Sequence, residues 1–262
     1  MEYENKMLLI EMVEKGVALV TLNNPPINIV TLPMSKEMAD TFAKLEIDSA
    51  VKVVVLTGAG VKGFCAGSDL RELAGIRNVV VDVKLRQENT SFNSIELLTK
   101  PTIAAIEGVV CGGGAEMAMC CDIRIISDKS RVGFPEIKLG VIPGSGGIWR
   151  LPRIVGYPKA VELMLLRELI SAPEAKEIGF ANHMVPAGTV VQAAVAMAKK
   201  IAEKPIRSLR MIKAAARTLQ DKSLEECVAA NFSYCEAVFG ANDAGEGIAA
   251  FLEKRPAAFD DK

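Results

Sequence analysis

Histidine is almost absent from this sequence of 262 residues, in which His183 is the only example. One histidine cannot supply a histidine-rich metal site, and any catalytic triad would have to be built on it. His183 lies in the apolar segment 181–185, so we interpret it as structural. Ser145 lies in a glycine-rich turn, but Pro143 stands where a nucleophile elbow requires glycine.

Paired cysteine motifs are also missing. The sequence has six cysteines, none of them in a CxxC pair, and Cys120 and Cys121 are adjacent. Adjacent cysteines suit neither zinc ligation nor an easy disulfide. We therefore predict buried, reduced thiols and no metal site.

The sequence has little net charge and no long apolar run. Lysine and arginine number 31 against 32 aspartates and glutamates, without a block of like charges. This balance favours neither a nucleic-acid partner nor a membrane surface. Residues 1–6 lack the cationic and apolar regions of a signal peptide, so we expect no membrane span and a cytoplasmic location.

The most informative stretch that the sequence does contain is the glycine triplet 112–114. It follows the β-branched, apolar run 102–106 and precedes an amphipathic run, which predicts a strand, a turn without side chains and the start of a helix. Backbone N–H groups at such a turn are unpaired and can stabilise a carbonyl oxygen that gains negative charge. Glu116 follows one helical turn later, near the same opening.

A second glycine-rich loop follows the apolar run 51–56, which we predict to be a strand buried on both faces. Gly58, Gly60 and Gly63 match the spacing of a dinucleotide-binding fingerprint. That fingerprint requires a helix to open within the glycines, whereas the helical pattern here starts only near Asp69. We therefore predict a loop that presents its backbone at residues 66–68.

Strand and helix patterns alternate along the first two thirds of the chain, which predicts an α/β fold with parallel pairing. Residues 8–12 and 17–22 form a predicted hairpin, and Ser35 is the expected N-cap of a helix over 35–45. The polar segment 75–99 is a candidate mobile wall of a pocket. Helices are predicted at 157–167, 173–178, 189–203, 205–219, 223–238 and 242–253. We divide the chain into a sheet-containing core, 1–195, and a helical module, 196–262.

Several motifs occur together in the order and spacing of a known family. They are residues 64–70 (FCAGSDL), 108–116 (GVVCGGGAE), 122–124 (DIR), 134–140 (FPEIKLG) and 143–147 (PGSGG), with a similar chain end at 251–255 (FLEKR). In these motifs, which span nearly the whole chain, the sequence resembles the crotonase (enoyl-CoA hydratase/isomerase) superfamily.

The resemblance implies a fold and a chemistry. The fold is a spiral of ββα turns with a C-terminal helical trimerisation module, assembled as a homotrimer or a dimer of trimers. The chemistry is stabilisation of the thioester enolate of an acyl-CoA, with a role in fatty acid metabolism and no cofactor beyond the CoA moiety of the substrate.

The resemblance also assigns roles to four residues. The N–H groups of Ser68 and Gly113 would form an oxyanion hole, Glu116 would deprotonate a water molecule, and Glu136 would deliver a proton to Cα. Syn addition of water to a 2-enoyl-CoA needs both a base and an acid, so the presence of two carboxyls favours an enoyl-CoA hydratase.

CoA contacts are implied at two places. The loop around the pantetheine and adenine corresponds to Ala66, Ser68, Asp69, Leu70 and Arg71. Phe251 and Lys254 would approach the adenine and phosphate from a neighbouring subunit. This sequence departs from the hydratase pattern at Phe134 and at residues 148–149, where bulky side chains predict an altered acyl pocket.

Two alternatives remain open from the sequence. A Δ3-Δ2 enoyl-CoA isomerase, or another crotonase-type lyase or hydrolase, could work with Glu136 alone. A non-catalytic CoA- or RNA-binding scaffold would use the lysines and arginines within 199–217, which we interpret instead as a solvated or inter-subunit face.

Overall fold

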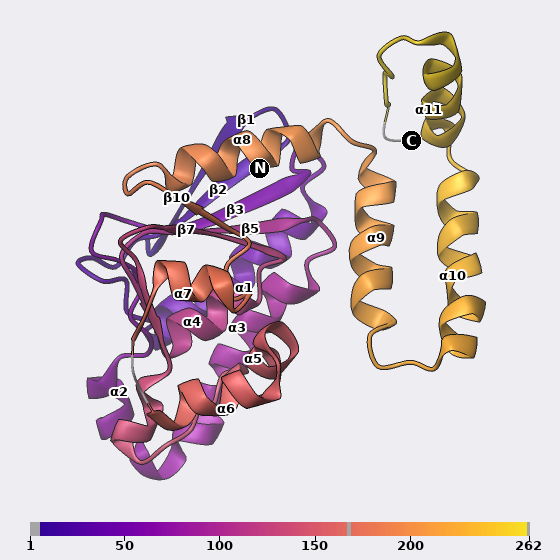
Figure 1. Ribbon diagram of the computed structural model, residues 1–262. Coiled ribbons are helices and arrows are strands. Elements are labelled where there is room, and N and C mark those ends of the chain that lie inside the picture. The colour runs from indigo at the N-terminus through magenta and orange to yellow at the C-terminus, as the bar shows by residue number, and fades with distance from the viewer. Residues whose placement is uncertain (1–5, 167–168, 261–262) are drawn as a thin grey trace.

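The computed structural model describes residues 6–166 and 169–260, so the expectation that residues 1–6 form no signal peptide falls mostly outside the described residues. The body of the molecule contains two sheets, and Figure 1 labels the strands of the larger one. The larger sheet has the order β1 (Leu8–Glu14), β2 (Val17–Leu22), β3 (Val53–Gly58), β5 (Thr102–Ile106), β7 (Ile123–Ser127) and β10 (His183–Val185). The smaller sheet has the order β4 (Gly63–Cys65), β6 (Val109–Cys111), β8 (Arg131–Gly133) and β9 (Ile170–Ser171).

The strand pairing confirms the predicted α/β class. β1 and β2 form the predicted antiparallel hairpin, and every other pairing in the larger sheet is parallel. β3 and β5 are buried on both faces because helices cover each side. On one side, α8 (Val190–Ala202) packs against alternate residues such as Val53 and Val55. On the other, Val54 and Leu56 contribute to the main core.

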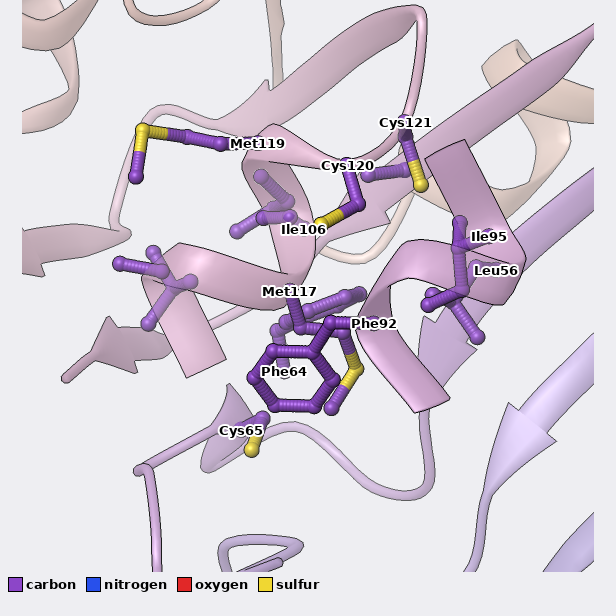
Figure 2. Packing of buried hydrophobic residues seen from close by; sticks show 14 of the residues in the cluster. Leu56, Phe64, Cys65, Phe92, Ile95, Ile106, Met117, Met119, Cys120 and Cys121 are labelled. Carbon is purple, nitrogen blue, oxygen red and sulfur yellow. The ribbon is translucent and has the colours of Figure 1, made fainter. Parts of the chain in front are cut away.

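That core lies between the larger sheet and three helices, α1 (Leu32–Ile47), α3 (Arg86–Leu97) and α4 (Gly113–Met119). Figure 2 shows Phe64, Phe92 and Met117 gathered at its centre. These residues come from β4, α3 and α4, so the same apolar contacts that build the core also fix the elements that surround the glycine triplet.

The predicted start of the first helix was wrong. Thr31 is the N-cap, because its Oγ1 accepts a hydrogen bond from the N–H of Met34 at 3.3 Å. Ser35 lies inside the helix, where it is buried and donates its hydroxyl to the Thr31 carbonyl. Both residue types cap helices well, and Pro33 in the first turn marks the earlier start.

The segment 70–97 is helical and only partly exposed. It comprises α2 (Leu70–Gly75), the 3₁₀ turn η1 (Arg77–Val79), the π-helix η2 (Val81–Leu85) and α3. Lys84 and Glu88 on this segment are buried. The segment therefore has an exposed side and also contributes buried charged residues, which together with Glu72 we call the charged cluster.

Shorter elements complete the body. They are η3 (Pro135–Leu139), α5 (Gly147–Val155), α6 (Tyr157–Leu166) and α7 (Ala172–Glu177). The helix that we predicted over 157–167 matches α6, and its last residue lies outside the described ranges. No helix within the described ranges is long and apolar enough to cross a membrane.

Three C-terminal helices stand away from the body (Figure 1). They are α9 (Ile206–Thr218), α10 (Leu224–Phe239) and α11 (Asn242–Glu253), and we call them the arm. Neither α9 nor α10 has a buried residue, whereas α8 buries Val190 and Ala202 at its two ends against the body. The boundary that we placed at residue 195 therefore falls inside α8, and the arm starts after it.

Candidate active site

The loops that follow β4 and β6 bring Ser68 and Gly113 together. β4 and β6 are parallel neighbours, so their carboxyl ends meet at one edge of the smaller sheet. A Cβ added to Gly113 would lie 3.6 Å from the Ser68 nitrogen. Within the described residues, neither backbone N–H donates to another group. The structure thus places two free N–H donors side by side, which is the geometry of an oxyanion hole.

Glycine is required where these loops touch. Gly67 has φ +92°, and a Cβ there would lie 3.0 Å from the Cys111 carbonyl oxygen. A Cβ on Gly114 would lie 2.0 Å from the carbonyl oxygen of Cys65. Backbone therefore packs directly on backbone, and the side chains that would separate the two N–H groups are excluded.

Glu116 lies one turn into α4, and its side chain is only 3 % exposed. Its Oε1 accepts hydrogen bonds from the N–H groups of Ser145 at 2.8 Å and Gly147 at 2.7 Å. Burial raises the pKa of this carboxyl to about 8, although the two N–H bonds act in the opposite direction. The carboxyl is therefore fixed in place and able to exchange a proton near neutral pH.

Glu136 approaches the triplet from η3. A Cβ on Gly112 would lie 3.3 Å from its Oε1. Both carboxyl oxygens of Glu136 are buried and accept no hydrogen bond from the described residues. Burial also raises the pKa of Glu136 above its usual range. A buried carboxyl without a partner favours the protonated form and a ligand beside it.

The structure thus brings together all four residues to which we assigned chemistry: Ser68, Gly113, Glu116 and Glu136. Two N–H donors lie next to two buried carboxyls with raised pKa values. This arrangement can polarise a carbonyl group and move protons on the carbon atoms beside it.

The residues predicted to contact CoA are divided between two regions. Asp69 caps α2 by accepting the N–H of Arg71 at 2.8 Å, and Leu70 is exposed, so this loop lies open beside Ser68. Ala66 is tied into the loop through its N–H, which donates to the Ile27 carbonyl. Phe251 is 83 % exposed on the arm. Lys254 caps the same helix, α11, which lies at the opposite end of the molecule from α2 (Figure 1).

Phe134 and Trp149, the two aromatic residues at which the sequence departs from the hydratase pattern, lie in different environments. Phe134 is fully buried in the main core, although we expected it to alter the acyl pocket. Trp149 is 43 % exposed on α5, and the guanidinium carbon of Arg150 lies 5.1 Å from its ring centre. Of these two aromatic side chains, only Trp149 has a substantial exposed surface.

Sequence reasoning missed a buried carboxylate, Glu88. Its Oε1 accepts the hydroxyl of Ser68 at 2.6 Å, and its Oε2 accepts the hydroxyl of Ser145 at 2.8 Å. The Nζ of Lys84 lies 3.3 Å from Glu88 Oε1 and 2.6 Å from Glu72 Oε2. The spacing of Lys84 and Glu88 is the only sequence signal, and an i, i+4 pair is more typical of an exposed helix face.

All six cysteines are free, but only Cys65, Cys120 and Cys121 are fully buried, so the prediction of burial was wrong for the other three. Burial raises the pKa of the Cys65 thiol to about 12 and that of Cys111 to about 11, which leaves both protonated.

His183 is exposed on β10. Across residues 6–166 and 169–260, no three His, Cys, Asp or Glu side chains form a group that could hold a metal ion.

The chain is similar to known proteins along nearly its whole length. The family model described as Enoyl-CoA hydratase/isomerase matches residues 12–262. A short-chain-enoyl-CoA hydratase of Clostridium acetobutylicum is 37% identical over 92% of this chain and 93% of its own length. A crotonyl-CoA hydratase of Syntrophomonas wolfei is 34% identical over 99% of both chains.

The fold also matches a solved structure. The crystal structure of an enoyl-CoA hydratase from Bacillus anthracis superimposes with a TM-score of 0.95 at 33% identity, over 98% of this chain and 100% of the other. Motifs, fold and full-length similarity therefore agree, and the chain belongs to the enoyl-CoA hydratase/isomerase family.

Proposed function

We propose that this protein is an enoyl-CoA hydratase that adds water syn across the double bond of a 2-enoyl-CoA. The observation that carries the proposal is the pair of buried carboxyls, Glu116 and Glu136, beside two free N–H donors. The names of two relatives, a short-chain-enoyl-CoA hydratase and a crotonyl-CoA hydratase, support a short acyl chain.

The oxyanion hole provides the first part of the mechanism. The thioester oxygen accepts hydrogen bonds from the N–H groups of Ser68 and Gly113. These donors are in place before the substrate arrives, so little reorganisation is needed as the oxygen becomes an enolate. Where one donor of an oxyanion hole has been removed in other enzymes, the rate falls by roughly 10²- to 10³-fold.

The two carboxyls provide the second part. Ionised Glu116 takes a proton from water, and the water oxygen bonds to Cβ while the π electrons move to the thioester oxygen. Protonated Glu136 then gives its proton to Cα, and the enolate returns to a thioester. Transfer of the proton from Glu116 to Glu136 restores the starting state. Burial raises the pKa of both carboxyls, so each can carry the proton at its stage of the cycle.

Hydration of crotonyl-CoA by the purified protein tests the proposal. We expect Glu116→Gln and Glu136→Gln each to lower kcat by roughly 10²- to 10⁴-fold, the range for loss of a general acid or base. Both substitutions keep the shape of the side chain. Hydration that survives both substitutions would contradict the mechanism.

One observation favours a second candidate, a Δ3-Δ2 enoyl-CoA isomerase. The carboxyl of Glu136 accepts no hydrogen bond from the described residues and faces the triplet, so it could carry one proton between two carbons without help. In that case the wild type would isomerise a 3-enoyl-CoA without hydrating crotonyl-CoA, and Glu116→Gln would leave isomerisation intact.

We further propose a homotrimer or a dimer of trimers. The exposed apolar side chains of the arm support this assembly, and so does the distance of Phe251 and Lys254 from the loop at Ser68 within one chain. A neighbouring copy would then supply these two residues to the CoA site. The proposal includes acyl-CoA as the substrate, no further cofactor, no nucleic-acid or membrane partner, and a cytoplasmic location.

A further inference from the structure

Glu88 connects the two halves of the candidate active site. We propose that Glu88 is a positioning residue for the hydration reaction, holding the oxyanion loop and the loop that orients Glu116 in one fixed arrangement through Ser68 and Ser145. This inference rests on the proposed function and adds a residue, on a separate element, that would act through the two serines.

The contacts of Glu88 use both of its oxygens. Oε1 accepts the Ser68 hydroxyl at 2.6 Å and Oε2 accepts the Ser145 hydroxyl at 2.8 Å. The backbone N–H of Ser68 is one of the two oxyanion donors, and the backbone N–H of Ser145 binds Glu116 Oε1 at 2.8 Å. A single side chain from α3 therefore reaches both groups that must be aligned.

The charge of Glu88 fixes the direction of these hydrogen bonds. An ionised carboxylate only accepts, so both serine hydroxyls must donate to it and neither can rotate toward another acceptor without losing that bond. Lys84, which is fully buried, lies 3.3 Å from Glu88 and also donates to the Val30 carbonyl at 3.0 Å. The ammonium group of Lys84 thus forms an ion pair with Glu88 on the side that faces away from Ser145 Oγ, at the same oxygen that accepts the Ser68 hydroxyl.

Glu88 also acts on Glu116 through its charge. Three elements face Glu116: the turn that carries the N–H groups of Ser145 and Gly147, η3 with Glu136, and α3 with Glu88. Burial is the main cause of the raised pKa of Glu116, and the carboxyls of Glu136 and Glu88 raise it further when they are ionised. Removing the charge of Glu88 should therefore lower the pKa of Glu116.

The test compares Glu88→Ala and Glu88→Gln in hydration of crotonyl-CoA. Because small displacements of catalytic groups cost up to about 100-fold, we expect Glu88→Ala to lower kcat roughly 10- to 100-fold. KM should change little, since Glu88 is buried and both of its oxygens accept serine hydroxyls. Glu88→Gln keeps the shape without the charge, so its loss of kcat should be smaller and the rising limb of its pH–kcat profile should move to lower pH.

Glu72→Gln is the matched control. It removes a carboxylate that lies 2.6 Å from the same lysine, but Glu72 contacts neither serine. We expect this variant to lose thermal stability while keeping the wild-type kcat and pH profile. A loss of kcat equal to that of Glu88→Gln would overturn the inference, because the effect would then belong to the ion pairs and not to the serine contacts.

A double serine variant and an NMR titration of Glu116 test the role of Glu88 independently of the Glu88→Ala variant. If Glu88→Ala does not fold, the double variant Ser68→Ala and Ser145→Ala removes the same contacts and should reproduce the loss of kcat. The ¹³C shift of the Glu116 carboxyl reports its titration without substrate, and Glu88→Gln should move its midpoint to lower pH. An unmoved midpoint with wild-type kcat would overturn the role of Glu88, whereas a moved midpoint in a protein without hydratase activity would overturn only the proposed function.

Discussion

Glu116 is held by two backbone N–H groups, yet burial raises its pKa from the usual value near 4.5 to about 8. The folded protein therefore binds a proton here more tightly than the unfolded chain does. The corresponding stability is fully present below about pH 4.5 and is lost as the pH rises through about 8. The carboxyl that serves the reaction thus lowers the free energy of unfolding in the pH range where it ionises.

Glu116→Gln should remove this dependence. The amide stays neutral and its oxygen can still accept the two N–H bonds, so the variant should match the wild type near pH 4.5. Near pH 9 its free energy of unfolding should exceed that of the wild type by roughly 5 kcal/mol, since the pKa of Glu116 rises from 4.5 to about 8 on folding and each pKa unit corresponds to about 1.4 kcal/mol. Urea unfolding at both pH values measures the difference, and an equal difference at both would contradict the assignment of the shift to Glu116.

The pH dependence of catalysis follows from the same group. A base must be ionised to accept a proton, so kcat/KM for crotonyl-CoA should rise with pH through about 8, the pKa of Glu116 in the free protein. A profile of kcat/KM that stays flat across this range would argue against Glu116 as the base.

The sequence allowed the positions of Ser68, Gly113, Glu116 and Glu136 to be predicted as one site because each lies at a short, fixed distance from a glycine turn or a motif residue. Their catalytic roles stay predictions. Glu88 could not be found in this way. Its partners lie 20 and 57 positions away in the sequence, and only tertiary packing turns a helical glutamate into a buried acceptor.

Among the secondary-structure elements, α4 depends most strictly on glycine. Gly114 lies in its first turn, where the helix packs against the backbone of β4. The helix can approach so closely only because no side chain intervenes, and this approach sets the position of Gly113 beside Ser68.

Gly114→Ala should therefore be strongly destabilising. The added Cβ would lie 2.0 Å from the Cys65 carbonyl oxygen, so either β4 or α4 must move. We expect a cost of about 3 kcal/mol or more in the free energy of unfolding, the upper range for overpacking. Gly75→Ala at the end of α2 is the control, because nothing lies within 4 Å of its added Cβ. Equal urea midpoints for the two variants would contradict this explanation.

Element prediction succeeded where the periodicity was strong and failed where several local signals competed. The β-branched runs of β3 and β5 could be recognised because both faces of these strands are buried. The start of α1 was misplaced because Thr31 and Ser35 are both suitable N-caps. Which of them caps the helix depends on tertiary packing, which buries Ser35 inside the helix. The π-helix η2 has no pattern of its own, since its residues fit ordinary helix equally well.

At the scale of the whole molecule, polar contacts that include two ion pairs attach the arm to the body. Lys213 pairs with Asp122 at 2.8 Å, and Asp221 pairs with Arg153 at 2.9 Å. A cavity of about 540 Å³ lies between α9 and the body. Large apolar side chains on α10 and α11 are exposed, among them Leu224, Val228, Phe232, Phe239, Ile248, Phe251 and Leu252. An exposed apolar surface of this kind is typical of a subunit interface.

Sedimentation equilibrium tests the proposed assembly. We expect a mass of three or six times 28.1 kDa for the wild type. Phe232→Lys places a charge on the apolar face of α10 and should shift the protein toward the monomer, because an unpaired buried charge is costly. Ser233→Lys adds the same charge at the neighbouring exposed position, away from that face, and should leave the mass unchanged. A wild type that sediments as a monomer would contradict the assembly.

Because of the π-helix η2, the ion pairs of Lys84 with Glu72 and Glu88 depend on the number of residues between α2 and α3. The N–H of Arg86 bonds to the Val81 carbonyl, an i→i+5 step that holds one residue more than an α-helical turn. Lys84 lies within that turn and pairs with Glu72 before it and Glu88 after it. A chain shortened by one residue ahead of Lys84 would keep every charge, yet α2 and α3 would meet out of phase. Pairing in this cluster is thus specified by the number of residues between its members as well as by their chemistry.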